Sequence, residues 1–360
     1  MKAPQATLRL APTLILVCLI ALAASVQARA ETLCDTILHR ETFVTLLGGS
    51  RERMLAVTQD RVALQKRQQH SVKATLATHG TESSIQEQSR INLDRITAEL
   101  GPNQPLSEEL EAQLSAVRFD FIHNTHVLSE NPDTPLLSTA ALLELGLPGG
   151  LNTHWFNREF LRSHDQLFFH VQSKLDGTKT QAMVSAYGSY GLRPKREYAI
   201  QRGWLSPYVM VPGNLVRFAA AAAPDLGALL AEKLAIDPDI QLEKQRYGRK
   251  PLIAFGFLSL QAQDAWVRRE EPLFREIMKR LHLLDFTVTD FEELARRLVR
   301  RRIHKHLSGE VVERYADPAE VLLKGPPDSV RLLIESTVTG YLDVSFEFKI
   351  PVALPADELQ

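Results

Sequence analysis

The stretch Arg118-Phe119-Asp120-Phe121-Ile122-His123 marks the point at which the sequence changes its pattern. Phe and Ile dominate this short run, which predicts a β-strand. Before it, from Glu31 to about Val117, polar residues prevail and Gly and Pro are scarce, which is typical of helices. After it, short β-rich runs alternate with helical stretches. The sequence therefore predicts an α+β protein, with a helical N-terminal region over residues 31–117 and a mixed-sheet domain over residues 118–360.

The N-terminal region is expected to form a helical hairpin or a small bundle. Apolar residues between charged ones predict an amphipathic helix near Arg51–Leu64, and a second helix follows over Glu82–Leu100. The breaker Gly101-Pro102-Asn103-Gln104-Pro105 ends it, and Ser107 is placed to cap a third helix. Two interpretations stay open: a packing arm of the main domain, or a module that binds a partner or acts as a lid.

The region after residue 118 is expected to mix strands and helices. The β-rich runs cover residues 119–123, 166–172, 182–186, 252–260, 320–323 and 341–350. The helical stretches cover residues 139–145, 215–234, 271–283 and 291–306. A largely helical region is therefore expected over about residues 215–310. In the last β-rich run, Phe346, Phe348 and Ile350 alternate with polar residues, which predicts a half-buried strand.

Composition excludes several classes of protein. The chain has 360 residues, of which 44% are apolar, and 42 Lys and Arg side chains face 43 Asp and Glu. These values exclude a disordered tail and a collagen-like rod. The formal net charge of −1 argues against a general nucleic-acid coat, which needs an excess of basic residues. The length is long enough for about two domains.

The N-terminus has the features of a targeting segment. Lys2 and Arg9 precede an apolar run from Leu14 to Ala24, and Ala28-Arg29-Ala30 follows it. This pattern predicts a signal peptide over residues 1–30 and therefore export, to the periplasm or out of the cell. An uncleaved membrane anchor is the alternative, although a transmembrane helix needs about 20 apolar residues. Cleavage would leave Cys34 as the one cysteine, which permits a disulfide between two chains but none within one.

One predicted helix, over residues 291–306, carries a dense basic run. Its spacing leaves two interpretations open. The run is either the solvated cationic face of an amphipathic helix, or an anion-binding patch for phosphate, nucleic acid or acidic lipid. The basic residues are Arg296, Arg297, Arg300, Arg301, Arg302 and Lys305.

Familiar catalytic motifs are absent from the sequence. It contains no H-E-x-x-H, no G-x-S-x-G and no Gly-rich phosphate loop. Histidines are concentrated between residues 123 and 170, so a metal-dependent hydrolase that uses this segment remains an alternative. We nevertheless predict that no metal is bound, because the ligand spacing of known metal motifs is missing. The histidines of the segment are His123, His126, His154, His164 and His170.

An ordered series of short motifs points to a different chemistry. His123-Asn124-Thr125 follows the first strand, and a helix with the turn Gly146-Leu147 comes next. Leu167-Phe168-Phe169, a Tyr-Gly region with Tyr187 and Tyr190, and Ala319-Glu320-Val321-Leu322-Leu323 follow in that order. Over roughly residues 118–350 this order resembles the ADP-ribosyltransferase superfamily of the His-Tyr-Glu type, which includes toxins. The long gap between Tyr190 and Glu320 would hold a helical insertion over about residues 215–310.

The resemblance implies a role for each matching residue, with NAD as the substrate. His123 would bind a ribose hydroxyl, with Thr125 beside it, and Tyr187 or Tyr190 would stack on the nicotinamide ring. Glu320 would stabilise the oxocarbenium-like cation that forms as nicotinamide leaves.

The phosphates and the acceptor complete this hypothesis. Arg158 or Arg193 would pair with the pyrophosphate, because a guanidinium matches its oxygens. The acceptor of ADP-ribose would be a protein or a small molecule. A binding protein without catalysis, exported in the same way, is the alternative from a different functional class.

Overall fold

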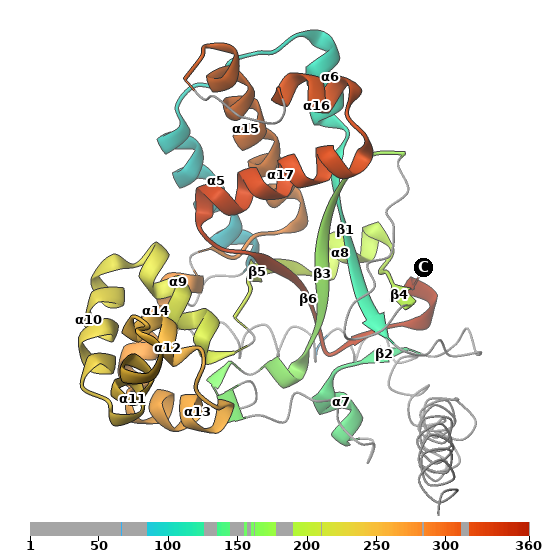
Figure 1. Ribbon diagram of the computed structural model, residues 1–360. Helices are drawn as coiled ribbons and strands as arrows, with labels where there is room; N and C mark the ends of the chain where they lie inside the picture. The colour runs from blue at the N-terminus through green and yellow to red at the C-terminus, as the bar shows by residue number, and fades with distance from the viewer. Residues whose placement is uncertain are drawn as a thin grey trace, which may run out of the picture.

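The computed structural model describes residues 66, 85–125, 135–144, 155–156, 160–161, 163–177, 190–209, 211–282, 284–310 and 317–359. At its centre lies a five-stranded sheet in the order β4-β1-β3-β6-β5, in which every neighbouring pair is antiparallel (Figure 1). Its strands are β1 (Val117–Thr125), β3 (Gln166–Leu175), β4 (Tyr190–Leu192), β5 (Trp204–Pro207) and β6 (Phe346–Pro351). A two-stranded sheet pairs β2 (Leu136–Leu137) with β7 (Ala353–Leu354).

Two long helices pack on one face of the central sheet. α15 (Val288–Leu307) places Phe291 against Phe119 of β1, with ring centroids 5.0 Å apart. α17 (Pro327–Leu342) meets β3, where the backbone N–H of Ser173 donates to Glu335 at 3.1 Å. Ser173 lies directly opposite Phe119 in the sheet, so both helices cover the same face. Further along that face, the stacked rings of Phe121 and Phe348 continue the core.

Two helices precede the sheet, as the sequence predicts for the part of the N-terminal region that the structure describes. They are α5 (Ile85–Leu100) and α6 (Glu108–Ser115). Ser107 caps α6 and accepts a hydrogen bond from Leu110 N. Ile96, Leu110 and Leu114 belong to the same hydrophobic core as the sheet. This packing corresponds to the interpretation of these helices as an arm of the main domain.

A group of helices lies to one side of the sheet (Figure 1). It falls within the predicted insertion. Its first two helices, α9 and α10, replace the single helix expected over residues 215–234, because Pro224 begins a new helix. The helices of the group are α9 (Pro212–Ala222), α10 (Pro224–Ala235), α11 (Pro238–Tyr247), α12 (Pro251–Phe255), α13 (Leu260–Arg269) and α14 (Glu271–His282).

Two predicted strands are helices in the structure. Residues 252–260, expected as a strand, contain α12 and a turn that leads into α13. Residues 320–323, also expected as a strand, lie within α16 (Pro318–Lys324). In α16 the Asp317 side chain accepts from Ala319 N, and Pro318 occupies the first helical turn. An Asp N-cap followed by Pro favours a helix start, and this local signal outweighs the β-branched Val321.

The remaining described elements are short. The predicted C-terminal strand is confirmed only from Phe346, because Tyr341 and Leu342 still belong to α17. Further helices are α7 (Thr139–Glu144), α8 (Arg196–Arg202), η2 (Ser163–Asp165) and η3 (Ala356–Glu358). Within the described residues, no helix is both long and apolar enough to cross a lipid bilayer. The predicted signal peptide, the helix near Arg51–Leu64 and the strand over residues 182–186 lie outside the described residues.

Candidate functional site

The basic helix α15 separates its arginines into two kinds. The helix begins at the capping side chain of Thr287, and its apolar positions, among them Leu294, Leu298 and Ile303, face the core. The arginines therefore emerge around the rim of that buried stripe. Among the described residues, four of the five arginines have acceptors on α15 itself or on neighbouring elements, and the fifth, Arg301, lines a groove. The contacts of each arginine decide which kind it is.

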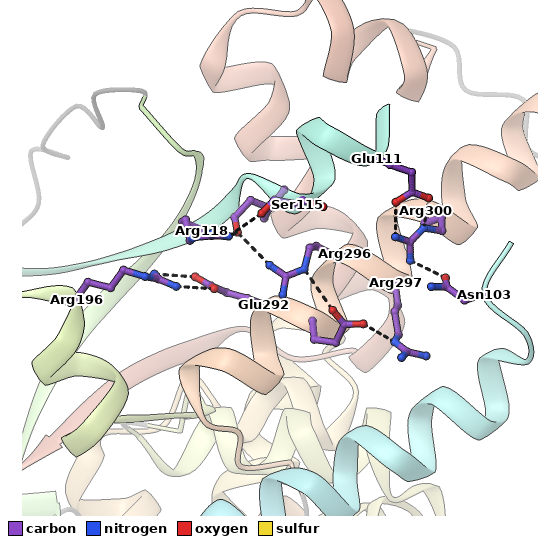
Figure 2. A network of polar contacts seen from close by, with 11 residues as sticks. Asn103, Glu111, Ser115, Arg118, Arg196, Glu292, Arg296, Arg297 and Arg300 are labelled. Atoms are coloured by element: carbon purple, nitrogen blue, oxygen red, sulfur yellow. Dashed lines mark hydrogen bonds and ion pairs between the residues drawn. The ribbon is translucent and has the colours of Figure 1, made fainter. Parts of the chain in front are cut away.

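The first turns of α15 anchor the helix to β1 and α8. Glu292 is buried and accepts two hydrogen bonds from Arg196, at 2.7 and 3.0 Å (Figure 2). The same carboxylate accepts a hydrogen bond from the backbone N–H of Phe119 at 3.0 Å. A buried carboxylate is stable only when it has such partners. This pair therefore has a structural role.

Three arginines of α15, namely Arg296, Arg297 and Arg302, have acceptors close by. Arg297 donates to Glu293 at 2.7 Å, and Arg296 donates to the same carboxylate at 3.4 Å (Figure 2). Arg302 donates to Thr337 of α17 at 2.8 Å. Ion pairs four residues apart on a helix surface contribute little free energy, but they reduce the positive charge that a ligand would meet.

Arg300 connects α15 to the segment that leads into α6. Its guanidinium donates to both oxygens of Glu111, at 3.0 and 2.6 Å, and to Asn103 at 2.6 Å (Figure 2). The hydrogen bond from Arg300 is the largest of the influences that hold the pKa of Glu111 below its usual value. The paired guanidinium fixes the segment of residues 101–104 against the end of α15.

A groove of about 510 Å³ lies between that segment and the C-terminal half of α15. One wall is formed by residues 100–104, which turn at Gly101, where φ is +74°. Ser308 and Glu310, which follow α15, also line the groove. Among the described residues that line it, the basic ones are Arg297, Arg300, Arg301, His304 and Lys305, and the acidic one is Glu310. The charge of the lining is therefore mainly positive.

Arg301 and Lys305 are the cations that this lining leaves for a ligand. Among the residues that the structure describes, no hydrogen bond or ion pair engages the Arg301 side chain. The pKa of Tyr341 is raised, mainly by burial and also by Glu99. The charge of Arg301 acts against this rise in part. Lys305 reaches Glu310 only at 3.9 Å. His304 lies beside them and is held in place by the carbonyl of Gln104 at 3.1 Å.

His123 lies on β1, on the face that the core covers. Its Nδ1 is 2.9 Å from the carbonyl of Phe168, and its ring meets Phe169 edge-on. Burial lowers the pKa of His123, and nearby His170 acts in the same direction. The imidazole is therefore neutral at pH 7, with Nδ1–H donating to the carbonyl. This bond fixes the orientation of the ring.

The sheet brings some of the motifs of the resemblance together. β1 pairs with β4, so that His123 lies opposite Leu192 and Thr125 lies opposite Tyr190. The side chains of Thr125 and Tyr190 lie outside the described residues, as do Tyr187 and Arg158. Arg193 is engaged by Asp120 at 3.3 Å.

Glu320 is not brought to this strand end. It is exposed on α16, which packs against α6 and α17. α6 leads into β1 at Val117, and His123 lies six residues further along the strand. At a rise of about 3.3 Å per residue, His123 is about 20 Å from Val117. Figure 1 shows α16 beside α6, at the opposite end of β1 from β4. The prediction that Glu320 lies on a late core strand is wrong, because residues 317–324 form a capped helix.

The polar side of the sheet holds buried carboxylates that sequence reasoning missed. Ser206 donates to Asp285 at 2.7 Å, and Glu347 lies 3.2 Å from Lys349. Burial raises the pKa of Glu347, while Lys349 opposes that effect. The half-buried strand predicted here puts Glu347 on the side opposite Phe346, Phe348 and Ile350, and the sequence does not show that this side is covered too. These groups are covered, with Asp285 2% and Glu347 5% exposed, which leaves them without an open approach for a substrate.

The histidine-rich segment forms no metal centre in the part of the chain that the structure covers. There, no cluster of three or more His, Cys, Asp or Glu side chains is placed to bind an ion. His164 lies near Asp165, at 3.9 Å, and His170 lies on β3. His126 and His154 are outside the described residues.

Comparison with known proteins adds no family to these observations. No protein-family model matches the chain, and a search of the curated proteins finds no match. The candidate site therefore rests on its own geometry. The basic run on α15 was visible in the sequence, but the opposite wall was not, because the breaker at residues 101–105 indicates only the end of a helix.

Proposed function

We propose that the protein binds a small phosphate-bearing molecule in the groove between α15 and residues 100–104. The observation that carries this proposal is the position of Arg301, whose guanidinium lines the groove and is engaged by no hydrogen bond or ion pair among the described residues. A guanidinium matches the geometry of phosphate oxygens and keeps its charge at every physiological pH. Lys305 also lines the groove and adds an ammonium donor.

The size and the lining of the groove favour a small ligand over a polymer. Its volume of about 510 Å³ lies within the range of small-molecule sites, about 300–1,000 Å³. The walls offer amide groups from Asn103 and Gln104 as well as cations. None of the described residues that line the groove is aromatic, so they offer no ring on which a nucleic-acid base would stack. This site corresponds to the binding-protein alternative of the sequence analysis.

Calorimetric titration with pyrophosphate and with NAD would test the proposal. We expect binding of pyrophosphate that weakens as salt is raised, because cations in contact with solvent are screened. The double variant Arg301→Ala/Lys305→Ala is expected to lose at least about tenfold in affinity. The matched control is Lys279→Ala/Arg280→Ala, which removes the same charges from α14. Equal affinity in wild type and in the groove variant would refute the proposal.

A second candidate function is NAD cleavage with transfer of ADP-ribose to an unidentified acceptor. Its support is the pairing of β1 with β4, which sets the backbone of His123, Thr125 and Tyr190 on neighbouring strands. The position of Glu320 on α16 argues against a reaction that uses this carboxylate. Incubation with NAD would separate the two functions. Nicotinamide release that is lost in both His123→Ala and Glu320→Gln would support NAD cleavage, and ADP-ribose found on an acceptor would support transfer. NAD binding without release would leave the groove as a binding site.

Export is proposed on the N-terminal pattern alone. If residues 1–30 are a signal peptide, the protein recovered from its natural compartment begins at Glu31. N-terminal sequencing would decide this directly, and a chain that begins at Met1 would contradict it.

A further inference from the structure

The segment from Lys244 to Leu260 has an unusual charge pattern. It contains four basic residues and no acidic one, in a chain whose overall charge is close to zero. It covers the end of α11, the whole of α12 and the first residue of α13. These elements belong to the helical group beside the sheet (Figure 1). The basic residues are Lys244, Arg246, Arg249 and Lys250.

The same segment exposes large apolar side chains. Tyr247 is 60% exposed, Phe257 58%, Ile253 51% and Leu260 46%. Scattered apolar residues are ordinary on a protein surface, but several together on one segment indicate an interaction surface. Ala254 and Phe255 of this segment are buried, so α12 is anchored in the core and exposes its opposite side with Ile253.

Arg249 joins two of the exposed rings into one surface. Its guanidinium lies 3.6 Å from the ring centroid of Phe257 and 4.5 Å from that of Tyr247. It also donates to Glu243 at 2.7 Å, which holds it in place. Tyr247 from α11 and Phe257 from the turn after α12 therefore stand side by side. We call the exposed residues Tyr247, Ile253, Phe257 and Leu260, with Lys244, Arg246 and Lys250, the docking patch.

The other three cations of the segment have no comparable partner. Lys244, Arg246 and Lys250 are exposed, and no hydrogen bond or ion pair engages their side chains among the described residues. Long basic side chains can keep their charge in a polar layer while their stems lie on apolar surface. Aromatic and aliphatic side chains surrounded by free cations are the combination that inserts at the boundary between lipid headgroups and acyl chains.

We propose that the docking patch binds the surface of an anionic lipid membrane. Charge complementarity selects this partner, because each free cation gains from the negative surface potential of anionic lipids. The exposed apolar groups would enter the boundary between headgroups and acyl chains. A free phosphate compound has no such apolar layer, so it would leave these groups in water. A protein interface is a poorer match, because its buried centre is depleted in charged residues. The groove on α15 takes no part in this proposal.

Vesicles of phosphatidylcholine, with and without phosphatidylglycerol, would test the proposal on the full chain. Hydrogen exchange is the direct readout, because it reports the docking patch separately from any apolar segment at the N-terminus. We expect slower exchange in peptides covering residues 244–260 with the anionic vesicles only. Unchanged exchange there, with or without sedimentation of the protein with vesicles, would overturn the proposal.

Variants make the test specific. Arg246→Gln/Lys250→Gln is expected to lower partitioning onto anionic vesicles by about 10- to 30-fold. Partitioning onto neutral vesicles is measured first and gives any contribution of the N-terminus, which is then subtracted. The control Lys279→Gln/Arg280→Gln removes the same charges from α14 and is expected to change little. Phe257→Ser, at an exposed position, is expected to weaken binding at every salt concentration. Protection of residues 244–260 by protein concentration alone would instead identify a second copy of the chain as the occupant.

Discussion

Arg300 of α15 and Glu111 of α6 share two hydrogen bonds, of 3.0 and 2.6 Å, across the junction of the helices. The same guanidinium reaches Asn103 at 2.6 Å. One side chain therefore fixes both a helix contact and a wall of the basic groove. Because its charge is matched by Glu111, the groove depends on Arg301 and Lys305 for its attraction to anions.

Removal of this contact is expected to destabilise the fold. Arg300 is only 12% exposed, so Arg300→Ala should lower the free energy of unfolding by about 1–2 kcal/mol at pH 7. Urea denaturation would measure this loss. The matched control is Arg297→Ala, whose partner Glu293 lies on the same helix and whose loss is expected to stay below about 0.5 kcal/mol.

The loss in Arg300→Ala should also depend on pH. The folded-state pKa of Glu111 is lowered, so the unfolded chain takes up this proton at a higher pH than the folded chain. The stability from this group is present above the unfolded pKa and disappears as pH falls through the lowered folded value. The difference between wild type and variant should therefore shrink in acid. A difference that stays constant from neutral pH to about pH 3 would contradict this account.

His123 predicts pH dependence in a higher range. Burial lowers its pKa below the model-compound value of 6.5, so the unfolded chain binds the proton first as pH falls. The free energy of unfolding therefore falls as pH drops below 6.5. This loss of stability is complete once pH is below the lowered pKa of the folded state. His123→Leu should flatten the pH profile of stability in this window. Part of the slope is expected to remain, because burial also lowers the pKa of His170.

The strands around His123 show what the sequence could predict. β1 and β3 begin within a few residues of their predicted positions, because their apolar runs are bounded by polar residues. Ser107 was identified as a cap, since its hydroxyl precedes two glutamates in the first turn. Glu320 failed for an instructive reason. Ala319-Glu320-Val321 resembles the late strand of a family pattern, but the Asp317 cap and Pro318 start a helix over the same residues.

Only the basic face of the groove, on α15, could be predicted from the sequence. Charge spacing on α15 is a local property, so the sequence revealed it. Which arginines are free depends on partners almost 200 positions away, such as Glu111 for Arg300. No local pattern encodes those distances. The burial of Glu347 was missed in the same way, because alternation along β6 does not say what covers its polar side.

Gly227 provides a test of helix packing in the helical group. A Cβ at this position of α10 would lie 2.7 Å from Ala220 Cα and 2.9 Å from Ala219 O of α9. Both are backbone atoms, so the helices would have to separate. Gly227→Ala should cost about 1–3 kcal/mol of stability. Gly340→Ala in α17 is the control, because its Cβ meets nothing within 4 Å, and it should stabilise by about 0.5–1 kcal/mol. Thermal or urea unfolding that shows the same sign for both variants would refute the close approach.

Glu310 tests the electrostatics of the groove without removing a binding residue. It is the acidic side chain of the lining and lies 3.9 Å from Lys305. Glu310→Gln removes a charge that repels phosphate and leaves Lys305 free. The affinity for pyrophosphate should rise about 2- to 5-fold at low salt, because the removal of one solvent-exposed repulsive charge has an effect of about this size. The gain should fall as salt is added, because the Debye length shortens.

The control for Glu310→Gln is Glu276→Gln on α14. Glu276 pairs with Lys279 and Arg280 and does not line the groove. Its effect on pyrophosphate affinity should be small at every salt concentration, because the charge it removes does not line the site. Unchanged or weaker binding in Glu310→Gln would mean that the anion does not sit beside Lys305. An equal gain in both variants would show that only the net charge of the protein matters, and the groove would then not be the binding site.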